Sequence, residues 1–87
     1  MTAFTVMSLD VWGNQRDGYE VNDQYDAGTI EVQEPWDQED IFRVLKAEGY
    51  FKRRIQRRSV EIEVQDDDVV LVNDRQGRPV YTVWRKP

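Results

Sequence analysis

Residues 35–51, PWDQEDIFRVLKAEGYF, contain the signals that decide the fold, because they mark both ends of a helix. Asp37 is a suitable N-cap, and Trp36 before it is placed to pack on Ile41 as a hydrophobic staple. Gly49 is typical of the left-handed residue that ends a helix, with the following tyrosine packed back against the last turn. The stretch therefore predicts a short helix between these two caps, with a narrow apolar stripe on one side.

Strand patterns lie on both sides of this helix. Before it, residues 3–12 and 19–32 are rich in β-branched and aromatic residues and are joined by turn residues, which predicts a hairpin. Gly28 predicts a bulge or bend in the second strand. After the helix, three alternating segments predict a meander, at residues 60–64, 69–72 and 79–84. The sequence therefore predicts one α+β domain over residues 1–87, in the order β-β-α-β-β-β, with a mainly antiparallel sheet and the helix packed on one face.

The composition narrows the classes of function. The chain has 87 residues, a formal net charge of −5, and neither cysteine nor histidine. These absences remove thiolate nucleophiles, disulfides, cysteine-based metal sites and the usual general base at neutral pH. No Gly-rich phosphate loop occurs, and no apolar window is long enough to span a membrane. We therefore expect a soluble cytoplasmic protein that is not an enzyme, binds no cofactor and makes no membrane contact.

The charges are distributed unevenly along the chain. Residues 43–58 hold seven cations against a single acid, for a local net charge of +6, whereas the rest of the chain carries a net charge of −11. Surface potentials follow local charge, because screening acts over about 10 Å. The candidate binding site is therefore a cationic patch that consists of Arg43, Lys46, Lys52, Arg53, Arg54, Arg57 and Arg58.

Residues 52–58 of the cationic patch are predicted to form a loop, a bulged edge or a separate short strand. If a regular strand continued backwards from Val60, its buried positions would fall on charged or polar residues, whereas Ile55 would face solvent. Five cations are also too costly to bury without partners. The segment is therefore expected at the surface.

Three kinds of partner are compatible with these cations. Within the protein, Arg53 and Arg57 would lie on the same side as Glu61 and Glu63 if the chain were extended. The second candidate is a nucleic acid, because arginine side chains are well suited to bind its phosphates. An acidic protein, a second copy of this chain included, is the third candidate.

Carboxylates are the remaining candidates for chemistry. Glu61 and Glu63 share one face of a predicted strand, and three consecutive aspartates follow at residues 66–68. Either set could be drawn as an acid–base pair or as a site for Mg²⁺ or Ca²⁺. Consecutive aspartates are typical of tight turns and lack the ligand spacing of a calcium loop. We therefore expect a solvated turn and a solvated sheet face, without a metal ion.

The aromatic residues supply candidate contacts. Tyr50 and Phe51 lie beside the arginines and could stack on an unpaired base, although the helix cap and the core also require them. Trp36 and Trp84 have structural positions, as helix staple and within a strand. Trp12, at a strand end beside a glycine, is the tryptophan best placed to contact a partner, while burial in the core is the commoner outcome.

Three segments of the chain resemble small uncharacterised proteins encoded by bacteriophages and prophages: LDVWGNQRDGYEVND at 9–23, DIFRVLKAEGYF at 40–51 and VNDRQGRPVY at 72–81. The resemblance is one of pattern and size over most of the length, and it assigns no functional residue. It implies an accessory factor that binds a host or phage macromolecule in the bacterial cytoplasm, and inhibitors of host defence are among such factors.

Charge distribution and resemblance together predict a binding protein. We expect it to modulate a host or phage protein through its charge-polarised surface, because such surfaces steer and orient a partner. The alternative is a nucleic-acid-binding protein that uses residues 52–58. A homodimer is also compatible with the segregated charges.

Overall fold

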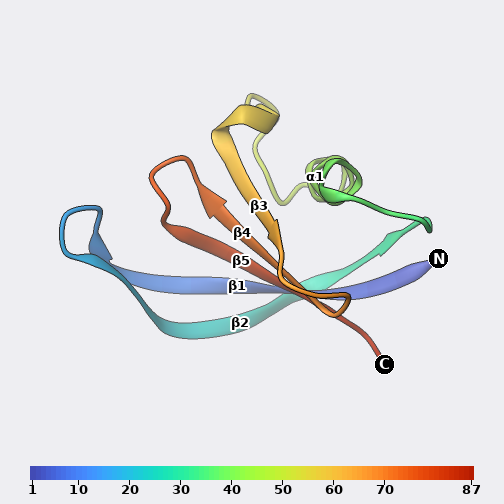
Figure 1. Cartoon of the computed structure of the whole chain (residues 1–87), viewed down its shortest axis with the longest axis horizontal. Coiled ribbons are helices and arrows are strands. Elements are labelled where there is room, and N and C mark those ends of the chain that lie inside the picture. The colour runs from blue at the N-terminus through green and yellow to red at the C-terminus, as the bar shows by residue number, and fades with distance from the viewer.

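The computed structural model describes all 87 residues. Its elements are β1 (Thr2–Asn14), β2 (Gly18–Val32), α1 (Gln38–Ala47), a 3₁₀ helix (Arg57–Ser59), β3 (Val60–Val64), β4 (Val69–Asp74) and β5 (Pro79–Arg85). The strands form one antiparallel sheet in the spatial order β2-β1-β5-β4-β3 (Figure 1). The predicted α+β class and the element order are confirmed.

Both ends of α1 form as the sequence predicts. The Asp37 carboxylate accepts a hydrogen bond from the backbone N–H of Asp40, and the Asp40 carboxylate accepts one from the N–H of Asp37, each at 3.0 Å. At the other end Gly49 has a φ of 89°, and the N–H of Tyr50 donates to the carbonyl of Leu45 at 2.9 Å. These are the bonds of a capping box and a Schellman motif. With ten residues, α1 is neither long nor apolar enough to span a bilayer.

The core lies between α1 and one face of the sheet. Figure 1 shows α1, seen nearly end-on, on one side of the sheet, and the helix contacts both β2 and β3, the two edges of the sheet. Phe4 and Val6 of β1 are fully buried beneath it, together with Ile41 and Leu45 of the helix. The ring of Trp36 lies edge-on to Phe4, with 5.2 Å between ring centroids. The helix is thereby anchored across the sheet and fixes where the cationic segment begins.

The β1–β2 hairpin extends beyond the part of the sheet that α1 covers (Figure 1). Its pairing shifts register twice, because β2 carries an extra residue at Ala27 and another at Asn22. The first shift lies beside Gly28, which has a φ of 135°, so the predicted bulge is confirmed. Every residue of β2 from Glu20 to Ala27 is exposed. The outer part of this hairpin is therefore a surface element without a cover.

Candidate functional site

The segment that follows α1 is a surface loop, as its sequence predicts. Residues 52–56 belong to no helix or strand, and a 3₁₀ helix then leads into β3. Two tight turns shape the loop: the N–H of Ile55 donates to the carbonyl of Lys52, and the N–H of Ser59 donates to that of Gln56, both at 2.9 Å. Ile55 packs against the core cluster. A single inward apolar residue thus anchors the loop and leaves its charged neighbours outside.

Three members of the cationic patch are engaged within the protein. Arg43 forms an ion pair with Asp40 one turn earlier on α1. The Nζ of Lys46 donates to the carbonyl of Ile55 at 2.8 Å. The guanidinium of Arg57 lies 2.9 Å from a carboxylate oxygen of Glu39 and also donates to the carbonyl of Val60 at 2.7 Å. These bonds tie the loop to the helix, so the two parts of the patch form one surface.

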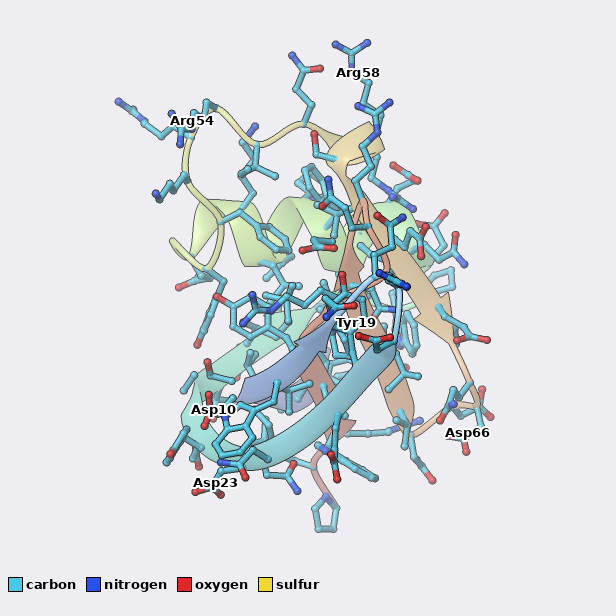
Figure 2. All side chains as sticks on the ribbon, turned by 90° about the vertical axis from the view of Figure 1, so that its left-hand side faces the viewer. Asp10, Tyr19, Asp23, Arg54, Arg58 and Asp66 are labelled. Carbon is cyan, nitrogen blue, oxygen red and sulfur yellow. The ribbon has the colours of Figure 1, made fainter.

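The other four members of the patch form no ion pair and no side-chain hydrogen bond within the protein. All four are exposed, three of them on the loop and Arg58 in the 3₁₀ helix. Figure 2 shows Arg54 and Arg58 directed away from the sheet, at the end of the molecule opposite Asp10 and Asp23. We call this set the free cations, namely Lys52, Arg53, Arg54 and Arg58.

The internal partner of the patch differs from the sequence-based expectation. Glu61 and Glu63 are exposed on β3 and take part in no ion pair, so the pairing with Arg53 and Arg57 that an extended chain would allow does not form. The expectation assumed an extended backbone between residues 52 and 63. The loop and the 3₁₀ helix instead turn Arg57 toward the first turn of α1, where Glu39 lies.

An open groove of about 540 Å³ lies where the helix and the loop meet. Phe42 forms its apolar floor, and both the Lys46 ammonium and the Arg57 guanidinium lie 5.9 Å from the centroid of that ring. Arg43 and Glu39 complete the polar rim. The groove thus joins three cations and one aromatic ring next to the free cations.

Two of the three candidate aromatic contacts are used inside the fold. Phe51 stacks on Phe42 at 5.5 Å and meets Tyr81 edge-on at 5.9 Å. The Tyr50 hydroxyl donates to the carbonyl of Ala27 at 3.1 Å, and the Tyr81 hydroxyl donates to the carbonyl of Tyr50 at 2.7 Å. Burial raises the pKa of Tyr81 and keeps it a donor. Tyr50 and Phe51 therefore have structural positions instead of lying free beside the arginines.

Trp12 lies on the outer part of the β1–β2 hairpin and is 63% exposed, so its expected burial in the core is wrong. Trp84 is also exposed, on the sheet face opposite the helix, although its strand position was expected to be structural. The sequence signal for this exposure was the position of Trp12 next to Gly13 of the turn, where β1 extends beyond the part of the sheet that the helix covers. Trp12 is thus available for a contact, apart from the cationic patch.

The acidic candidates do not come together. Asp66 is used in the β3–β4 turn, where its side chain accepts from the backbone N–H of Asp68 at 2.7 Å and of Val69 at 3.0 Å. No group of three or more acidic side chains is placed to hold a metal ion. These carboxylates therefore have a local structural role at the turn and a solvated position on β3.

The largest groove of the molecule, about 650 Å³, lies at the N-terminal end of α1 and includes no member of the cationic patch. Glu34, Trp36 and Asp67 line it, together with Arg85. The pKa of Glu34 is lowered, first by a hydrogen bond from the Thr2 hydroxyl and then by the nearby Arg85. The ion pair between Glu34 and Arg85 therefore lies within this groove.

The capping box gives a pH dependence that can be tested. The backbone N–H of Asp37 and then the guanidinium of Arg43 hold the pKa of Asp40 below its usual value. Because the pKa is lower in the folded state, ionised Asp40 stabilises the fold above about pH 4, and this contribution is lost as the pH falls through the folded value. We expect Asp40→Asn to be less stable than wild type at neutral pH and to approach wild type as the pH falls through the folded-state pKa of Asp40.

The measurement is urea unfolding followed by tryptophan fluorescence at several pH values. Asp67→Asn is the control, because this exposed carboxylate forms no hydrogen bond or ion pair. A loss for Asp40→Asn that does not change with pH would contradict the assignment.

Comparisons of the chain with protein-family models, with curated proteins and with solved structures found no match.

Proposed function

We propose that this chain is a non-enzymatic binding protein that modulates a host or phage protein, and that its cationic patch binds an acidic segment of that partner. The observation that carries the proposal is the set of four free cations, Lys52, Arg53, Arg54 and Arg58, on the loop and the 3₁₀ helix that follows it. Exposed cations without internal partners raise the rate of encounter with an acidic surface and orient it. Inhibition of a host defence protein is one form that such modulation takes.

The size of the patch favours an acidic protein segment over a long nucleic acid. The molecule measures 39 × 28 × 21 Å, so a chain longer than the patch would extend over the rest of the surface, which carries a net charge of −11. A polyanion that extends past the patch would be repelled by this remainder, whereas a short acidic segment would not. The rings of Tyr50 and Phe51, on which unpaired bases would stack in the nucleic-acid alternative, pack within the fold.

Fluorescence anisotropy tests the proposal with two labelled probes, an acidic peptide of about ten residues and a single-stranded DNA of about equal length, at about 50 and 200 mM salt. We expect the peptide to bind more tightly at the lower salt concentration. Arg53→Ala combined with Arg54→Ala should weaken it about fivefold to tenfold, because each exposed charge pair contributes up to about 1 kcal/mol.

The matched control is Arg16→Ala combined with Arg75→Ala. It removes the same charge from exposed cations that lie outside the patch and form no side-chain bond. Equal weakening by the two double variants, or no peptide binding at low salt, would contradict a role for the patch. Tighter binding of the DNA than of the peptide, lost in the patch variant, would favour the nucleic-acid alternative. Affinity capture from a bacterial host, with the same two variants, then identifies the partner.

A further inference from the structure

A second surface lies on the outer part of the β1–β2 hairpin. β2 is an edge strand that pairs with β1 on one side only, and all its residues from Glu20 to Ala27 are exposed. An edge strand of this kind presents unpaired backbone donors and acceptors to any extended chain. The register shifts at Asn22 and Ala27 leave a regular run of four residues between them, Asp23–Asp26. A strand that pairs here is therefore short.

Large apolar side chains are exposed on this hairpin to an unusual extent. Trp12 is 63% exposed, Tyr25 is 56% exposed and Val21 is 47% exposed. The register places Trp12 opposite Glu20, and Tyr25 opposite Ser8. Because directly paired residues share a face, both aromatic rings lie on the same face of the hairpin. Exposed aromatic residues beside a free edge are typical of a protein-binding surface.

The acidic residues between these rings indicate the charge of a segment that would bind here. Asp10 and Asp23 are direct partners across the hairpin, on the same face as both rings, and like charges directly opposite each other destabilise a sheet. A side-chain hydrogen bond with Asp23, and then the negative charge of Asp23 and, to a smaller extent, that of Asp10, raise the pKa of Tyr25. No lysine or arginine occurs between residues 17 and 42. The Asn22 side-chain amide donates to Asp10 and the backbone N–H of Gln24 donates to Asp23, but neither carboxylate forms an ion pair within the protein. A bound cation would therefore relieve the remaining repulsion.

A second copy of this chain is a poor pairing partner for the edge of β2. Antiparallel pairing of β2 with its own copy would bring Glu20, Asp23 and Asp26 of the two strands together. Acidic edges disfavour such pairing, as charged edge strands do in general. The charge that complements this edge is positive.

We propose that the edge of β2 at Asp23–Asp26 accepts a short, extended, lysine- and arginine-rich segment of a protein partner as a sixth strand. Backbone hydrogen bonds to the edge position the segment. Its cations lie against Asp23 and Glu20, and its apolar residues pack on Tyr25 and Trp12. This site is separate from the cationic patch and has the opposite charge.

The probe is a labelled peptide of about eight residues in which pairs of lysines alternate with pairs of valines, so that each face of the extended peptide presents both residue types. It is titrated into the protein at about 50 mM salt, and amide shifts of ¹⁵N-labelled protein locate the contact. We expect the shift changes to concentrate at residues 20–26. Asp23→Asn combined with Glu20→Gln should weaken binding at least about tenfold, because two charge pairs and their strand register are lost.

Two controls make the test specific. Glu61→Gln combined with Glu63→Gln removes the same charge from β3, the other edge of the sheet, and should leave binding unchanged. A peptide with alternate backbone amides methylated keeps its charge but cannot complete the hydrogen bonds of the added strand, and should not bind. The proposal is overturned by equal binding of the methylated peptide, by equal weakening in the β3 variant, by absence of binding at low salt, or by self-association of the protein through β2 in sedimentation.

Discussion

Phe4→Ala is expected to lower the free energy of unfolding by about 3–5 kcal/mol, the range for truncating a buried phenylalanine. Phe4 is fully buried between the sheet and α1, and its ring meets the edge of Trp36. The substitution leaves a cavity at the point where the helix is anchored to β1. Since domains of this size are stable by about 5–15 kcal/mol, the loss is a large fraction of the total.

Met7→Ala is the matched control for this prediction. Met7 lies on the same strand but on the opposite face of the sheet, and it is only partly buried. Its truncation should cost about 1 kcal/mol. Urea unfolding followed by tryptophan fluorescence measures both variants, because Trp36 reports on the site of the cavity. Similar losses at the two positions would contradict the location of the core on the Phe4 face.

The parts of the fold that the sequence predicted well are those fixed by local chemistry. The Asp37 cap and the Gly49 cap each require one residue type in one backbone conformation, so they can be read from a few neighbours. The bulge beside Gly28 belongs to the same class, because a positive φ favours glycine. The surface loop was predicted by parity: a strand continued back from Val60 in register would bury charged or polar residues and expose Ile55.

The parts that the sequence did not predict depend on how separate segments meet. The pairing of Arg57 with Glu39 requires the loop to turn back over the first turn of α1, and nothing in the neighbouring residues specifies that turn. The exposure of Trp12 depends on how far the helix covers the sheet. The hydrogen bond from Tyr50 to Ala27 joins residues 23 positions apart. Each of these contacts is set by tertiary packing, which local patterns do not encode.

Gly28→Ala is expected to destabilise the protein by about 2–4 kcal/mol, through two effects that add. Gly28 has a φ of 135°, a conformation that costs alanine about 1–2 kcal/mol. A methyl group at this position would also come closer to the Tyr50 hydroxyl oxygen than van der Waals contact allows. Displacing that hydroxyl breaks its hydrogen bond to the carbonyl of Ala27, which ties the residue after α1 to β2.

Two further variants separate the backbone effect from the steric one. Gly49→Ala changes a glycine with a φ of 89° and no heavy atom within 4 Å of the new methyl group, so it should cost only about 1–2 kcal/mol. Tyr50→Phe removes the obstructing hydroxyl, and in that background Gly28→Ala should fall to about the same cost. A coupling of about 1 kcal/mol or more between the two changes in urea unfolding would therefore measure the contact. Strictly additive losses would show that the hydroxyl does not lie against Gly28, and the cationic loop would then lack this link between the end of α1 and the sheet.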